Sequence, residues 1–131
     1  MSEKSRYSEE EIQSMSGFQL LLLLYDEAGE RLSEAEAQLD GGDYEGFGDS
    51  LQRVSQIVHY LREILDMNYA VSGDLSRIYE YLIYDISVVK AGRESRRDEI
   101  GRIRHILSEL REGFEGAGKQ VDQAESEVEN R

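Results

Sequence analysis

The chain contains no cysteine, no proline and no tryptophan among its 131 residues. The absence of cysteine excludes a disulfide-stapled secreted scaffold and fits a reducing compartment, so we expect a cytoplasmic protein. With 39% hydrophobic and 33% charged residues, the remaining composition is typical of a single globular, mainly helical domain.

Basic residues are also scarce, because 15 lysines and arginines stand against 28 acidic residues and give a formal net charge of −13. Proteins that bind nucleic acid need clustered cations to displace counterions from the phosphates. We therefore expect no nucleic acid among the partners of this chain.

A long hydrophobic run is missing as well. The most hydrophobic stretch is GFQLLLLLYDEAG, which is largely apolar only from Phe18 to Tyr25 and then continues with Asp26 and Glu27. A membrane-spanning helix needs about 20 apolar residues, and the acidic residues at 9–11 oppose the positive start of a signal peptide. The leucines are thus expected in a protein interior, and we expect no membrane contact.

Apolar residues recur at alternating steps of three and four, which is the pattern of amphipathic helices. The pattern predicts helices at about 17–39, 43–68, 73–91 and 95–116. Their short connections favour an all-α fold, an antiparallel up-and-down four-helix bundle. Residues 1–16 then form an N-terminal strap, and residues 117–131 form a short, acidic, weakly helical C-terminal tail.

The predicted core is the set of residues that repeat at this spacing. Asp43 is the expected N-cap of the second helix, and Gly41 with Gly42 is the expected stop of the first. The repeating residues are Phe18, Leu21, Tyr25, Ala28, Leu32, Ala35 and Leu39; Tyr44, Phe47, Leu51, Val54, Val58, Leu61 and Leu65; Leu75, Tyr79, Leu82, Ile86 and Val89; and Ile100, Ile103, Leu107, Leu110 and Phe114.

Helical bundles often hold metals, so the two histidines were tested as ligands. A di-iron carboxylate site uses Glu-x-x-His on two helices, but Gln56 precedes His59 and Arg102 precedes His105 at that spacing. A cysteine nucleophile and a phosphate-binding loop are also missing. The sequence therefore predicts no catalytic residue, no metal, no cofactor and no enzymatic activity, with the histidines structural or exposed to solvent.

Four motifs, taken in order, resemble the flagellin export chaperones of the FliS family. SMSGFQLLLLLYDEAGERL is similar to the family's T-A-S-P-x-E-L-x-x-M-L-Y-D-G-A, and GDYE to its G-D-Y-E at the entry to the second helix. LDMNYAVSGDLSRIYEYLIYDI is similar to G-G-E-I-A-x-N-L-x-x-L-Y-x-Y-M, and ILSELREGF stands where the family often has E-L-R-x-x-W. The resemblance covers about residues 7–114.

The resemblance implies a cytoplasmic chaperone that binds the disordered C-terminal segment of flagellin, prevents its premature polymerisation and assists its flagellar secretion. It also allows contacts with the export apparatus and with flagellar regulators, by a monomer or a weak homodimer. A disordered client docks amphipathic helices into apolar grooves and folds as it binds. The alternative is a generic helical adaptor or dimerisation bundle that binds another amphipathic helix.

Apolar residues outside the predicted core mark the expected flagellin-binding grooves. The alternative is that the helix at 73–91 is simply the most buried helix of the bundle. The candidates are Ile57, Tyr60 and Ile64 in the second helix, and Ile78, Tyr81, Ile83, Tyr84 and Val88 in the third.

Two further candidates, Tyr7 and Ile12, stand alone as apolar residues in the acidic strap. In the family a tyrosine precedes the first helix in much this way, and the strap contributes to flagellin binding. We expect both residues to lie across an apolar groove in the free protein and to rearrange when flagellin binds. A disordered tail is the alternative.

Overall fold

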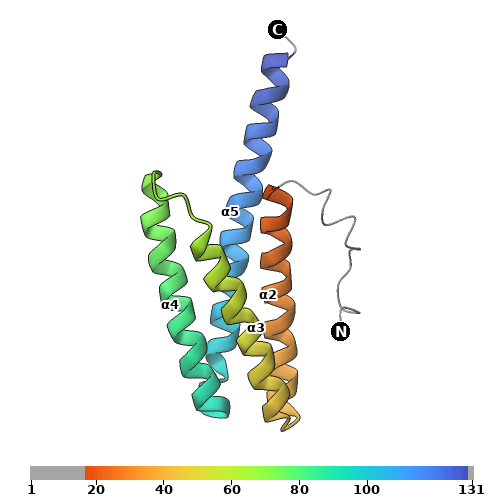
Figure 1. Cartoon of the computed structure of the whole chain (residues 1–131). Coiled ribbons are helices and arrows are strands. Elements are labelled where there is room, and N and C mark those ends of the chain that lie inside the picture. The colour runs from red at the N-terminus through yellow and green to blue at the C-terminus, as the bar shows by residue number, and fades with distance from the viewer. Residues whose placement is uncertain (1–16, 130–131) are drawn as a thin grey trace.

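The computed structural model describes the backbone of residues 17–129 and the side chains of residues 17–118. Consecutive helices alternate in direction and pack beside each other, and the last helix packs against the first (Figure 1). The predicted all-α antiparallel up-and-down four-helix bundle is thereby confirmed. Its elements are α2 (Gly17–Asp40), α3 (Tyr44–Glu63), α4 (Ala70–Gly92), the 3₁₀ turn η2 (Arg93–Arg96) and α5 (Asp98–Glu129).

The turn between α2 and α3 follows the sequence closely. Gly42 adopts a positive φ of 76°, a conformation that glycine reaches without steric cost. Asp43 caps α3 because its Oδ1 accepts a hydrogen bond from the Gly46 amide at 3.0 Å. A Cβ at Gly46 would overlap the Asp43 carboxylate, so a glycine at this position permits the cap.

The second helix was predicted to continue to residue 68, and this is wrong because α3 ends at Glu63. Asp66 folds the chain into a turn instead: its Oδ1 accepts the Asn68 amide at 3.0 Å, and its carbonyl accepts the Ser72 hydroxyl at 2.6 Å. Such local side-chain bonds compete with the helical hydrogen bonds. The next helix accordingly begins at Ala70 rather than at 73.

The bounds of the fourth predicted helix, 95–116, also need correction at both ends. The turn η2 delays its start to Asp98, since Ser95 donates to the Gly92 carbonyl at 2.7 Å. The helix then continues to Glu129, well beyond the ends of the other helices in Figure 1. Residues 117–129 are rich in glutamate, glutamine and alanine, which favour helix.

The buried core follows the predicted repeat. Every predicted core residue is buried except six, which are half-buried or exposed: Phe18, Leu21, Tyr44, Leu65, Leu110 and Phe114. The hydroxyls of Tyr25 and Tyr79 hydrogen-bond to each other within the core, and the Phe114 ring lies 5.9 Å from the Tyr25 ring. Burial and the shared hydrogen bond raise the pKa of Tyr25, so both phenols remain neutral.

Three arginines, Arg97 just before α5 and Arg104 and Arg111 within it, form ion pairs with acids of α2. Their order along the chain is the reverse of the order of their partners along α2, as antiparallel helices require. Arg97 hydrogen-bonds Asp40 and lowers the pKa of that carboxyl, and Asp26 raises the pKa of Arg111. The pairs are Asp26–Arg111 at 2.7 Å, Glu36–Arg104 at 2.5 Å and Asp40–Arg97 at 2.7 Å.

Within residues 17–129, no helix combines the length and the apolar character that crossing a bilayer requires.

Candidate functional site: three apolar faces of the α3–α4 hairpin

Exposed hydrophobic side chains are concentrated in one half of the bundle. Of the nine large hydrophobic residues that stand exposed among the described residues, eight belong to α3, α4 and the loop between them. The ninth, Phe18, packs its ring against Gly118 of α5, where a Cβ would overlap it. The α3–α4 hairpin, residues 44–92, is therefore the part of the described surface that presents apolar groups.

Two predicted residues, Tyr60 and Ile64, lie on the side of α3 that faces α2. Arg53 establishes this orientation, because its guanidinium bonds Glu27 of α2 at 2.9 and 3.1 Å. Tyr60 and Ile64 follow Arg53 by seven and eleven residues, and residues at these spacings lie on the same side of a helix. Tyr60 is 51% exposed and Ile64 is 49% exposed, and we call this pair the α2/α3 face. Ile57, predicted with them, is buried in the core instead.

A second surface, the α4/α5 face, carries Tyr81 and Val88. The guanidinium of Arg102, on α5, lies 5.6 Å from the centroid of the Tyr81 ring, within the range of a cation–π contact. Val88 follows Tyr81 by seven residues and shares its side of α4. Ile78, from the same prediction, is half-buried and packs against the core. Tyr84 points outward with 67% of its surface exposed.

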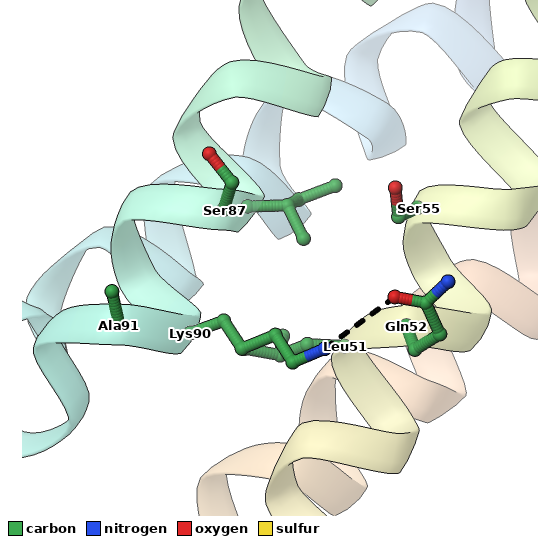
Figure 2. A pocket seen from close by; sticks show the side chains of 7 residues that line it. Leu51, Gln52, Ser55, Ser87, Lys90 and Ala91 are labelled. Carbon is green, nitrogen blue, oxygen red and sulfur yellow. Dashed lines mark hydrogen bonds between the residues drawn. The ribbon is translucent and has the colours of Figure 1, made fainter.

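The third surface is an open groove between α3 and α4 with a volume of about 460 Å³. Figure 2 shows Ser55 and Ser87 on opposite walls of this groove and Lys90 reaching across it toward Gln52. We call it the α3/α4 groove; its lining residues are Leu51, Gln52, Ser55, Ile86, Ser87, Lys90 and Ala91.

The floor of the α3/α4 groove is apolar and its rim is polar. Leu51 and Ile86 are buried core residues, and they come to the base of the groove from opposite helices. Further along the same junction, Arg62 of α3 pairs with Glu80 of α4 at 3.0 Å. Ile83 follows Glu80 by three residues, which turns it toward α3 and places it half-buried on this side.

The structure thus distributes the predicted binding residues over several faces of one hairpin rather than bringing them into one groove. Among the described residues, Tyr81 and Tyr84 of α4 stay 39% and 67% exposed. Tyr7 and Ile12 lie outside the described residues.

Sequence reasoning missed the apolar tip of the hairpin. Met67, Tyr69 and Val71 are 63%, 65% and 60% exposed, and they lie at and just after the loop that joins α3 to α4. Large apolar side chains within a short connection were the available signal. The polar rim of the α3/α4 groove gave none, because Gln52, Ser55 and Ser87 are ordinary residues for a solvent-facing helix.

One buried acid also went unnoticed. Asp85 is 5% exposed on α4, and its Oδ2 has no hydrogen-bond partner. Burial and the neighbouring Glu99 carboxyl raise the pKa of Asp85 to about 6, while Arg96 opposes the shift. An aspartate inside the apolar run YEYLIYDISVV was a readable signal, since a buried carboxylate is costly without a partner.

The described residues offer no metal centre. They contain no group of three or more histidine or acidic side chains placed to hold a metal ion. Both histidines are exposed to solvent, and His105 pairs with Glu109 at 3.2 Å on the surface of α5. Of the two roles expected for the histidines, structural or exposed to solvent, the structure shows the second.

A comparison with protein families identifies the fold's relatives. The family described as flagellar protein FliS matches residues 1–121 of this chain. The chain belongs to the FliS family. The FliS family consists of flagellar export chaperones for flagellin, which agrees with the resemblance in the four sequence motifs. No curated protein matches the chain.

Proposed function

We propose that this FliS-family chain acts in the cytoplasm as an export chaperone that binds the disordered C-terminal segment of flagellin. It keeps that segment from premature polymerisation and assists flagellar secretion, without catalysis and without a cofactor. The observation that carries the proposal is the gathering of eight exposed large hydrophobic residues on the α3–α4 hairpin of a FliS-family bundle.

Separate apolar faces suit a disordered client better than a folded one. A disordered chain wraps over a large surface and docks several short amphipathic helices in succession. The α2/α3 face, the hairpin tip, the α3/α4 groove and the α4/α5 face follow one another around the same two helices. The exposed tyrosines Tyr60, Tyr81 and Tyr84 add amphipathic rings, which tolerate water when the surface is free and exclude it when the client is bound.

Calorimetric titration tests this function directly. The titrant is a peptide of about forty residues from the C-terminus of flagellin of the same organism. We expect stoichiometric binding with a negative heat-capacity change, the mark of apolar burial. Absence of binding at peptide concentrations up to about 100 μM would overturn the proposal and favour the generic helical adaptor. A dissociation constant of about 100 μM corresponds to a binding free energy of only about −5.5 kcal/mol.

The strap belongs to the same proposal. We propose that Tyr7 and Ile12 cover an apolar face of the bundle in the free protein and move when flagellin binds. Deletion of residues 1–11 is then expected to change the affinity for the peptide, because it removes a competitor or a contact. Unchanged affinity would contradict this role.

Partners and assembly complete the proposal. The export apparatus and flagellar regulators are the further partners that we propose, and we propose a monomer or a weak homodimer. Sedimentation velocity of the free protein and of its complex with the peptide measures the assembly. A tight dimer that persists at nanomolar concentration would contradict it.

A further inference from the structure

Almost all of the cationic side chains within residues 17–118 have a charged or aromatic partner. Within residues 17–118, eight of the ten arginines lie within salt-bridge distance of a carboxylate. The other two, Arg93 and Arg102, lie over the rings of Tyr44 and Tyr81. Such complete pairing is expected where 28 acidic residues face 15 basic ones.

Lys90 is the exception. Its Nζ donates one hydrogen bond to the Gln52 side-chain oxygen at 3.4 Å, and no carboxylate or aromatic ring accompanies it in the described structure. A neutral amide at that distance is a weak partner for an ammonium group, because strong charge-assisted bonds are shorter and have an ionised acceptor. In a chain of net charge −13, acidic partners are plentiful, so a lysine without an ion pair is unusual.

The position of Lys90 connects this charge to the α3/α4 groove. Its Cε lies 3.6 Å from the place that a Cβ on Gly48 would occupy, so its alkyl stem extends over α3. The ammonium then reaches toward Gln52 across the groove (Figure 2). Leu51 and Ile86 are the buried apolar residues that line the same groove. An apolar floor with a single cation at its edge suits a segment that offers an apolar side chain and an acid.

Desolvation makes this preference selective. A purely apolar segment that covered the groove would bury the Lys90 ammonium without a partner, and an uncompensated buried charge is strongly unfavourable. A carboxylate within reach removes that penalty and replaces the weak amide bond with a charge-assisted one. The rest of the acidic surface repels acidic segments, so this groove is the place where one is accepted.

We propose that Lys90 recognises a carboxylate of the client segment that docks in the α3/α4 groove, while an apolar side chain three or four residues away on the client rests on Leu51 and Ile86. The inference rests on the proposed function, since the client is the C-terminal segment of flagellin. Lys90 is thus a specificity-determining residue of the groove.

A double-mutant cycle tests the proposal. Lys90→Gln removes the charge at similar length, and it is titrated with the forty-residue flagellin peptide and with variants in which each Asp or Glu is replaced singly by Asn or Gln. We expect Lys90→Gln to weaken binding of the unmodified peptide about tenfold. One of the neutralised peptides should bind the wild type about tenfold more weakly than the unmodified peptide does. The same neutralised peptide should bind Lys90→Gln with the affinity that the unmodified peptide has for this variant. Lys90→Arg should restore most of the affinity.

Arg77→Gln is the matched control, because Arg77 is another exposed α4 cation but pairs with Asp74 at its own helix surface. It changes the net charge equally and is expected to alter affinity less than twofold. Equal binding by wild type and Lys90→Gln would overturn the recognition while leaving the proposed function intact. Equal losses in Arg77→Gln, or losses spread over every acidic position of the peptide, would also overturn it. Failure of the wild type to bind any peptide would overturn both.

Discussion

The two halves of this bundle differ in what they do with their surfaces. Three arginines, Arg97 just before α5 and two within α5, form ion pairs with α2, and the Phe18 ring packs against Gly118 at the end of this junction. The α3–α4 hairpin carries eight exposed large hydrophobic residues instead, and α4 makes close contact with α3 but only sparse contact with α5. Both halves contribute to the same buried core.

This difference separates holding the fold from presenting a surface. Burial of apolar area supplies most of the folding free energy, and both halves share in it. The ion pairs on the α2–α5 side neutralise the charged groups there, so this side offers a partner few unpaired groups to contact. The hairpin leaves apolar area in water at a cost that is recovered when a partner covers it. Substitutions in the two halves should therefore change different measurements.

The largest expected effect is loss of stability from a core residue of the α2–α5 half. Leu32 on α2 is completely buried, so Leu32→Ala leaves a cavity and is expected to lower the free energy of unfolding by about 2–5 kcal/mol. Urea unfolding measures the loss. Leu23→Ala is the control, because Leu23 is only half-buried on the same helix and lies outside the core cluster. Equal losses would contradict the prediction that the cost follows burial in the core.

The next largest effect is a gain in the free energy of unfolding. It comes from Asp85, on the side of α4 that faces the sparse α4–α5 junction. The pKa of Asp85 is raised from 3.8 to about 6 in the folded protein, so the folded state binds this proton more tightly than the unfolded state. Its ionisation therefore penalises folding above pH 6, and the penalty vanishes as the pH falls toward 4. Asp85→Asn is expected to raise the free energy of unfolding at pH 7.5 by about 1–3 kcal/mol.

Urea unfolding of Asp85→Asn and wild type at pH 7.5 and pH 4.5 checks the sign. The difference between the two proteins should be large at the higher pH and small or reversed at the lower one. Asp49→Asn removes an equal charge from an exposed site of α3, and it reports the effect of net charge. A difference that is the same at both pH values would contradict the assignment to Asp85.

The inward faces of the helices were predictable from the sequence because burial follows the helical repeat. Leu32, Val54, Leu82 and Ile103 were placed in the core by spacing alone, and all four are completely buried. Tyr44 breaks the rule, because it is the first residue of α3 and stays 40% exposed beside Arg93 and Glu94. The end of α3 was missed because the Asp66 turn depends on local hydrogen bonds that periodicity does not report.

The binding surfaces were less predictable, for a geometric reason. Periodicity tells whether a side chain points inward or outward, but which helix it then faces depends on bundle packing. Tyr60 and Tyr81 were predicted as binding residues without assignment to particular grooves, and the structure places Tyr60 toward α2 and Tyr81 toward α5. Lys90 carried no signal, because an exposed lysine is ordinary until its neighbours are known to lack acids.

A moderate effect on client binding, without loss of stability, is expected from the hairpin. Tyr60 is half exposed and belongs to the α2/α3 face, so Tyr60→Ser removes apolar area that only a client would cover. Affinity for the flagellin peptide should fall about tenfold, while the free energy of unfolding changes by less than about 0.5 kcal/mol. Gln56→Ser on the same helix is the polar control. A larger loss of stability than of affinity would place Tyr60 with the core.

The smallest expected effect comes from an ion pair of the α2–α5 junction. Arg104 contacts Glu36 at 2.5 Å, but the two side chains remain 35% and 21% exposed. Water and salt screen such a pair, so Arg104→Gln is expected to lower the free energy of unfolding by only about 0.5 kcal/mol in dilute buffer, and by less at about 1 M salt. Urea unfolding at the two salt concentrations measures both values. A loss above about 2 kcal/mol that persists in high salt would mean that the ion pairs, rather than the apolar faces beneath them, hold α5 to α2.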